Sequence, residues 1–85
     1  MEIYYSPKFR RQYKKLTLFV KGQAERVEKL FRTNPFNAKL RTHKLGGRFK
    51  KYWSFSIDYK NRIIFEFDER DVIRFHAVGD HSIYD

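Results

Sequence analysis

Lys51 to Val78 has the sequence KYWSFSIDYKNRIIFEFDERDVIRFHAV, and this stretch decides the fold of the chain. Within it, bulky apolar residues alternate with polar ones in three runs that polar or charged turns separate. A period of two is typical of strands that bury one face. The stretch therefore predicts three strands sharing one apolar face. The residues predicted for that face are Trp53, Phe55, Ile57, Ile63, Phe65, Phe67, Ile73, Phe75 and Ala77.

A continuous apolar face also predicts how these strands pair, because a slip of one residue would turn every side chain to the other face. The predicted pairs on the apolar face are Ile57 with Ile63, Phe55 with Phe65, Phe67 with Ile73, and Phe65 with Phe75. The predicted pairs on the open face are Asp58 with Arg62, Ser54 with Glu66, Glu66 with Arg74, and Arg62 with Val78. This register places Arg62 near the polar terminus GDHSIYD, residues 79–85.

Two helices are predicted before the sheet. Ser6 can cap the first helix, and Pro7 suits its first turn. Thr17 can cap the second, and Asn34-Pro35 ends it, because the residue before proline avoids the helical region. Their apolar stripes, at helical spacing, consist of Phe9, Tyr13 and Leu16, and of Val20, Ala24, Val27, Leu30 and Phe31.

A further strand is predicted at residues 2–5, and a basic loop with a Gly46-Gly47 turn at residues 36–51. These elements predict an α+β fold: an antiparallel-rich, twisted sheet of about four strands with two N-terminal helices on one face. The length of 85 residues predicts a single domain, residues 1–85.

The amino-acid composition limits the kinds of partner that the chain is expected to bind. The formal net charge is +9, which favours polyanions such as nucleic acid or an acidic inhibitor protein. Cysteine is absent, so neither a disulfide framework nor a thiolate metal site is expected. No apolar run approaches membrane-spanning length and the N-terminus lacks the sections of a signal peptide, so we expect a cytoplasmic protein without a membrane partner.

Several segments together resemble a known family. They are the basic residues around Gly46-Gly47, YWSFSI at 52–57, RIIF at 62–65 and VGDH at 78–81, following two helices. In these the chain resembles the RelE/ParE superfamily of bacterial toxins from type II toxin-antitoxin modules, most closely the RelE and YafQ-like mRNA interferases. The resemblance spans nearly the whole chain. It implies cleavage of mRNA in the ribosomal A site and neutralisation by a cognate antitoxin.

Cutting RNA without a metal requires removal of the 2′-hydroxyl proton, charge balance on the phosphate and protonation of the leaving 5′-oxygen. Arg62 matches the strand arginine of the family, which implies a phosphate clamp; the alternative is an ion pair with Asp58. His81 matches the family position after the last strand, where YafQ-like members carry histidine, which implies an acid or base. The alternative for His81 is a solvated terminal side chain.

Three further candidates come from the same resemblance. His43 falls where YafQ-like members place a histidine before the sheet, and Tyr84 where the family ends in an aromatic residue. An ordinary loop histidine and an aromatic packed on the sheet are the alternatives. Ser56 and the Lys60-Asn61 turn stand at positions of other YafQ-like polar residues, so Glu66 is added as a candidate carboxylate base on the open face.

Basic residues of the loop are expected to bind RNA phosphates without reading sequence. They are Arg41, Lys44, Arg48, Lys50 and Lys51. His76, Asp80 and His81 lie close in sequence, but strand alternation separates the histidines and no second cluster completes a ligand shell, so we expect no metal and no cofactor.

Three functions remain possible after these steps. The first is a metal-independent, ribosome-dependent mRNA endoribonuclease that inhibits translation. The second is a ParE-like toxin that poisons DNA gyrase without cutting RNA, and a degenerate member that only binds its antitoxin is a third possibility. Titratable side chains around Arg62 favour the nuclease, because a pure binder has no use for them.

Overall fold

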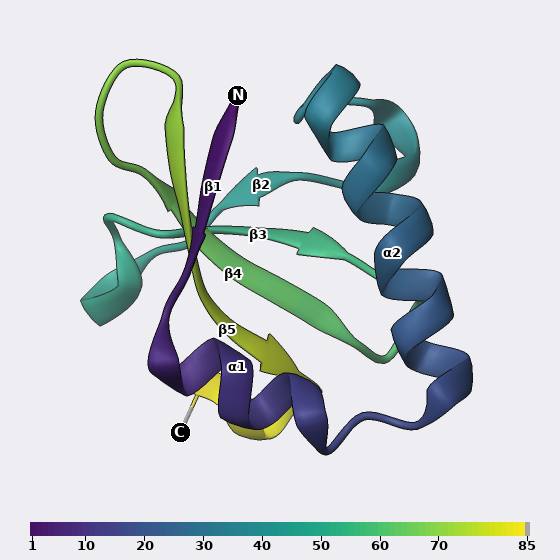
Figure 1. The fold of residues 1–85 in the computed structure, drawn as a ribbon. Coiled ribbons are helices and arrows are strands. Elements are labelled where there is room, and N and C mark those ends of the chain that lie inside the picture. Colours follow the sequence, from purple (N-terminus) through teal and green to yellow (C-terminus); the bar gives the residue numbers. More distant parts are fainter. Residues whose placement is uncertain (85) are drawn as a thin grey trace.

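The computed structural model describes residues 1–84; Asp85, the last residue of the predicted polar terminus, lies outside the described residues. A five-stranded sheet with the order β1-β5-β4-β3-β2 forms the centre of the molecule (Figure 1). The strands are β1 (Glu2–Tyr5), β2 (His43–Lys44), β3 (Trp53–Ser56), β4 (Arg62–Phe67) and β5 (Val72–Gly79). β1 runs parallel to β5 and the other neighbours are antiparallel. The predicted α+β fold is confirmed, with one strand more than expected because β2 forms inside the predicted basic loop.

Both predicted helices are present, with the predicted caps. In front of α1 (Pro7–Lys14) the Ser6 hydroxyl accepts a hydrogen bond from the Phe9 N–H at 3.0 Å. In front of α2 (Leu18–Thr33) the Thr17 hydroxyl accepts one from the Val20 N–H at 3.2 Å. α2 ends at Asn34, whose φ of −159° is extended, as the following proline requires.

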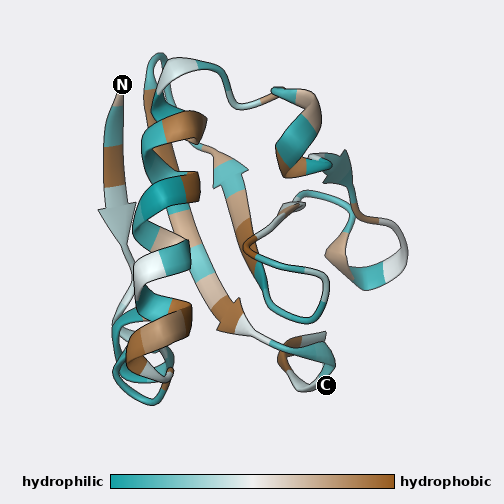
Figure 2. Ribbon diagram, turned by 90° about the vertical axis from the view of Figure 1, so that its right-hand side faces the viewer, coloured by the Kyte–Doolittle hydropathy of each residue, from teal (hydrophilic) through white to brown (hydrophobic). Residues whose placement is uncertain are grey.

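The two helices cover one face of the sheet (Figure 1), and one phenylalanine lies at the centre of that interface. Phe31 of α2 is fully buried. Its ring stacks on Phe55 at a centroid distance of 4.6 Å and meets Phe65 and Phe75 edge-on at 5.0 and 5.5 Å. These rings come from the three central strands, so α2 is held to the sheet mainly by side chains. Figure 2 shows hydrophobic residues both on α2 and on the strands behind it.

The β3–β4 register differs from the prediction by two residues. Phe55 lies opposite Ile63, and Ser56 opposite Arg62. The predicted pairs Phe55–Phe65, Ile57–Ile63, Asp58–Arg62 and Ser54–Glu66 are therefore wrong. Asp58 is the cause, because its carboxylate accepts hydrogen bonds from the N–H groups of Lys60 and Asn61 at 2.9 and 2.6 Å. Because of this local turn, β3 stops pairing with β4 at Ser56, two residues before the position predicted from the pairing of apolar residues.

A β-bulge changes the second half of β5. Pairing is as predicted at Phe67–Ile73, Glu66–Arg74 and Phe65–Phe75. Beyond this point Ile64 lies opposite Ala77, so His76 is an extra residue on β5. The predicted pair Arg62–Val78 is wrong, since Arg62 lies opposite Gly79. The bulge also reverses the alternation: Val78 enters the core instead of Ala77.

Ala77 thereby helps build a second, smaller apolar cluster on the face away from the helices. Its buried members are Ile64, Ala77 and Ile83. Ile83 belongs to the C-terminal 3₁₀ helix η3 (His81–Tyr84), which lies on this face together with Leu45 and Tyr52. The face predicted to be partly open is covered in this region by η3, Leu45 and Tyr52. Two further short helices, η1 (Ala38–Leu40) and η2 (Gly47–Phe49), lie in the segment before β3.

The bulge residue predicts a pH dependence of stability. The His76 ring stacks on Tyr52 at a centroid distance of 4.7 Å, and burial, followed by nearby Lys8, lowers the pKa of His76 below 6.5 although Glu66 opposes the shift. The unfolded chain then binds more protons than the folded one below that pH. We expect the free energy of unfolding to fall as pH drops from about 6.5 through the folded pKa. Denaturant titrations at pH 7.5 and 5.5 should show a smaller fall for His76→Phe, which keeps the ring but does not titrate; equal falls would contradict this.

Candidate active site

Arg62 opens β4 and is the first element of the candidate site. It lies opposite Ser56 of β3 on one side and Gly79 of β5 on the other, so it is fixed between two neighbouring strands. Its guanidinium donates a hydrogen bond to the Ser56 hydroxyl, and Ser56 is buried. A guanidinium held in this way has further N–H donors available for a ligand.

No carboxylate among residues 1–84 neutralises the charge of Arg62. Among residues 1–84 its side chain forms no ion pair, and Asp58, its predicted alternative partner, is occupied by the Asn61 and Lys60 N–H groups. Arg74 on β5 is different, since Glu66 and Asp68 lie 3.5 and 2.9 Å from its guanidinium. Of these two strand arginines, Arg62 is therefore the one available to an anion.

His81 and Tyr84 reach this face on η3. The helix begins after Gly79, and the Asp80 carboxylate accepts a hydrogen bond from the Ser82 N–H at 3.0 Å, which lowers the pKa of Asp80. His81 is exposed, and Tyr84 is half-buried with its hydroxyl 3.5 Å from that of Ser54. The Arg48 guanidinium donates to the Tyr84 carbonyl at 2.9 Å, so η3 is tied to η2. Residues 81–84 thus form a 3₁₀ helix, and Tyr84 combines the packing role with a hydroxyl directed at the sheet.

His43 joins the same face through β2. It lies directly opposite Ser54, and residues directly opposite each other in a ladder point to one face. Its Nδ1 is 3.0 Å from the Arg41 carbonyl, a contact that orients the ring, and the side chain is exposed. The short strand β2 therefore brings His43 to the face of β3 that carries Ser54 and Ser56, the two serines that Tyr84 and Arg62 contact.

Glu66 is not brought to this group. It lies four residues after Arg62 on β4, about 13 Å along the strand, and forms an ion pair with Arg74. As a catalytic base it stays a prediction that the geometry does not favour. The histidine near Glu66 is His76, whose ring stacks on that of Tyr52, one residue before β3.

The predicted RNA-binding residues divide between two faces. Lys44 lies opposite Trp53, with its ammonium 5.8 Å from the indole centroid, and so points to the helix side of the sheet. Lys51 lies over the Tyr52 ring at 5.4 Å and Arg48 contacts Tyr84, both on the side of His43. Arg41 and Lys50 are exposed.

Ser54 and Gly79 belong to the site although neither was predicted as a site residue from the sequence. Ser54 is fully buried between His43 and Tyr84, and no signal in the sequence distinguishes it from the other strand serine. Gly79 has a φ of 153°, and a Cβ at this position would lie 2.7 Å from Cγ2 of Ile83. A glycine between the last strand and a polar terminus was the available signal, because such close approaches favour glycine.

Glycine substitutions should therefore have opposite effects at two positions. Gly79→Ala strains the backbone and pushes η3 away, and we expect a loss of about 1–3 kcal/mol in the free energy of unfolding. Gly22→Ala in α2 meets no atom within 4 Å and should stabilise by about 0.5–1 kcal/mol, because alanine favours the helix. Denaturant titrations of both variants test this. Changes of the same sign would contradict the role assigned to Gly79.

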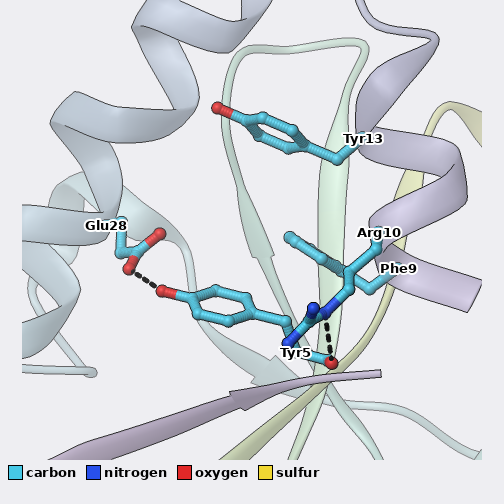
Figure 3. A pocket seen from close by; sticks show the side chains of 5 residues that line it. All are labelled: Tyr5, Phe9, Arg10, Tyr13 and Glu28. Carbon is cyan, nitrogen blue, oxygen red and sulfur yellow. Dashed lines mark hydrogen bonds between the residues drawn. The ribbon is translucent and has the colours of Figure 1, made fainter. Parts of the chain in front are cut away.

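A hollow of about 370 Å³ lies elsewhere, between β1 and the two helices (Figure 3). It is lined by Tyr5, Phe9, Arg10, Tyr13 and Glu28. Figure 3 shows the Tyr5 hydroxyl directed at Glu28, and burial together with this hydrogen bond raises the pKa of Tyr5. The Tyr5 hydroxyl donates to Glu28, Arg10 donates to the Tyr5 carbonyl, and the Tyr13 hydroxyl donates to the Lys21 carbonyl. None of the predicted site residues lines this hollow, so we do not assign the chemistry to it.

Within residues 1–84, no three histidine, aspartate or glutamate side chains are grouped so that they could hold a metal ion. No helix in the same range has the length and apolar character needed to cross a bilayer.

Two N-terminal helices on one face of a mixed five-stranded sheet define a small bacterial toxin fold of the RelE/YoeB kind. The chain belongs to the family described as bacterial toxin of type II toxin-antitoxin system, YafQ, whose model matches residues 1–84. The predicted resemblance to RelE and YafQ-like toxins is thereby confirmed.

Solved structures agree with this fold. YafQ from Escherichia coli strain BL21(DE3) superposes with a TM-score of 0.77 at 21% identity, over 98% of this chain and 96% of the other. A YoeB/ParE toxin from Agrobacterium tumefaciens gives 0.80 at 14% identity, over 95% and 99%. YafQ in the E. coli DinJ-YafQ toxin-antitoxin complex gives 0.74 at 22% identity, over 96% and 93%. No curated protein matches the sequence.

Proposed function

We propose that this toxin is a metal-independent endoribonuclease that cuts mRNA in the ribosomal A site and so inhibits translation in the cytoplasm. The observation that carries the proposal is Arg62, a strand arginine without a carboxylate partner among residues 1–84, on the face that also bears His43 and Tyr84. A guanidinium fork suits two phosphate oxygens at once.

The chemistry proceeds by attack of the ribose 2′-oxygen on the adjacent phosphorus. One imidazole takes the 2′-hydroxyl proton, the new P–O bond forms, and the 5′-oxygen leaves with a proton from the second imidazole. Arg62 balances the extra negative charge on the pentavalent phosphate. The products are a 2′,3′-cyclic phosphate, which water can open to a 3′-phosphate, and a 5′-hydroxyl.

His43 and His81 share the acid and base roles in this proposal. Imidazole changes charge near neutral pH, and both side chains are exposed, so each can reach a bound strand. Tyr84 supports them, since its ring can stack on a base and its hydroxyl can donate a hydrogen bond. Arg41, Arg48, Lys50 and Lys51 add phosphate contacts at the rim.

A cognate antitoxin is the proposed protein partner. YafQ of E. coli and YoeB of Staphylococcus aureus are each described in complex with one, DinJ and YefM. The net charge of +9 indicates that the partner of this chain is acidic where it makes contact. Binding over the Arg62 face would exclude RNA.

Programmed ribosomes test the proposed activity. Incubation with the toxin should cut the mRNA at the A-site codon and leave 5′-hydroxyl ends, and prior addition of the antitoxin should prevent it. Intact mRNA together with gyrase trapped on DNA would overturn the proposal in favour of a ParE-like activity.

A further inference from the structure

A second hollow lies directly beside the Arg62 site. It has a volume of about 200 Å³ and is lined by Lys39, Arg41, Ser56, Ile57, Asp58 and Tyr59. Ser56 also accepts the hydrogen bond from Arg62, so a single side chain separates the hollow from the phosphate clamp. The volume is below the roughly 300 Å³ of sites for drug-sized ligands, and it suits one nucleotide unit of a longer strand.

Tyr59 presents a free aromatic ring at this hollow. It is 90% exposed, which is unusual for so large a ring and leaves both of its faces in water. The turn that carries it is nevertheless fixed, because Asp58 binds the backbone of Lys60 and Asn61 on the far side of Tyr59. An exposed ring on a rigid turn is a suitable platform for a nucleobase, since the backbone that carries it is already ordered and only the side-chain torsions of Tyr59 are fixed on stacking.

Two cations face the same hollow. Lys39 comes from η1 and Arg41 from the residue after it, and neither forms an ion pair with any residue from 1 to 84. The side chain of Asn37 accepts from the Lys39 N–H at 2.9 Å, which fixes the start of η1. Asp58 is the one carboxylate in the lining, and its oxygens are taken up by Asn61 and Lys60.

Building on the proposed function, we propose that this hollow is a subsite for the nucleotide next to the scissile phosphate, whose base stacks on Tyr59 and whose own phosphate is held by Lys39 and Arg41. An RNA strand crossing from Arg62 over Ser56 meets these groups in turn. An acidic protein segment would use the cations, but it has no comparable use for a free aromatic face.

Direct binding measures the subsite without cleavage. The probe is a fluorescent hexanucleotide RNA with 2′-O-methyl groups, which cannot be cut, added to the full-length protein. Tyr59→Ala should weaken binding about tenfold or more, and Tyr59→Phe should stay near wild type because the ring remains. Phe19→Ala is the matched control, since Phe19 is an aromatic residue 73% exposed on α2.

The salt dependence of RNA binding tests the phosphate contact proposed for Lys39. Lys39→Ala should make the slope of log affinity against log salt shallower by about 0.7, as expected for one lost contact to single-stranded phosphate. Lys29→Ala, which removes an exposed lysine of α2, should leave the slope unchanged. On programmed ribosomes, Tyr59→Ala should lower kcat/KM by a similar factor and flatten the preference for the flanking base.

The outcomes separate this inference from the proposed function. Tyr59→Ala that binds RNA and cuts mRNA like Phe19→Ala overturns the subsite while leaving the nuclease in place. Loss of antitoxin binding with unchanged RNA binding also overturns it, and assigns the hollow to the protein partner. A third outcome is that the wild-type toxin leaves ribosomal mRNA intact while Tyr59→Ala weakens oligonucleotide binding. That outcome supports the subsite and contradicts the proposed cleavage.

Discussion

Replacing Arg62 by alanine is expected to lower kcat/KM for mRNA cleavage on programmed ribosomes by about 10²–10³-fold. The reason is that the positive charge of Arg62 is held in a fixed place on the proposed RNA-binding face. The guanidinium is held by Ser56 and by pairing on both sides of β4, and no carboxylate among residues 1–84 neutralises it. A preorganised cation of this kind stabilises the charge that builds up on the phosphate in the transition state.

Arg62→Lys separates charge from geometry. Lysine keeps the positive charge but lacks the planar fork that contacts two phosphate oxygens together. We therefore expect an intermediate rate, above that of Arg62→Ala and below that of the wild type. Circular dichroism and thermal unfolding of both variants should remain close to the wild type, because Arg62 is outside the main core.

Arg70→Ala is the matched control for net charge. Arg70 is exposed in the β4–β5 turn, at the opposite end of β4 from Arg62, and its removal also lowers the net charge by one. It should cleave at nearly the wild-type rate. If Arg62→Ala and Arg70→Ala have equal rates, Arg62 is not the phosphate clamp.

Phe31→Ala is expected to cost about 3–5 kcal/mol in the free energy of unfolding. The side chain is fully buried and contacts three aromatic rings of the sheet at centroid distances of 4.6 to 5.5 Å. Its removal leaves a cavity that those rings, held on three strands, cannot fill. A chain of 85 residues has a total stability of roughly 4–13 kcal/mol, so the variant should be largely or partly unfolded at 37 °C.

The measurement is a denaturant titration followed by circular dichroism. Phe19→Ala is again the control, because it removes the same ring from the same helix at a position 73% exposed, and should change the stability by less than about 0.5 kcal/mol. A midpoint for Phe31→Ala equal to that for Phe19→Ala would show that α2 is not anchored through this residue.

Local patterns in the sequence determined the elements and the family. Ser6 and Thr17 predicted both helix starts, because a capping hydroxyl acts on residues only three positions away. Alternation in residues 53–57 and 63–65 predicted which side chains enter the core, since strand geometry alone separates the two faces. Phe67, predicted for the same face, contacts Phe65 but is 42% exposed, so it is not part of the core. The motifs from Tyr52 to His81 indicated the toxin family that the full-length match confirms.

Register and the composition of the site depended on contacts between distant residues. The bulge at His76 placed Ala77 on the outer face and Val78 in the core, and Ile83 packs with Ala77 on the face that the sequence predicted to be partly open. No local pattern announces such a bulge, because it depends on how two strands and η3 fit together.

The same holds for the candidate catalytic group. Two residues of the predicted basic loop pair with β3, and this brings His43 opposite Ser54. Glu66 lies four residues along β4 from Arg62, and it forms an ion pair with Arg74 instead. The sequence by itself determined which chemically useful residues the toxin carries, because residue type and helix or strand period are local properties. Only the tertiary structure decided which of them share one surface, because strand register and ion pairing are set by contacts between segments far apart in the chain.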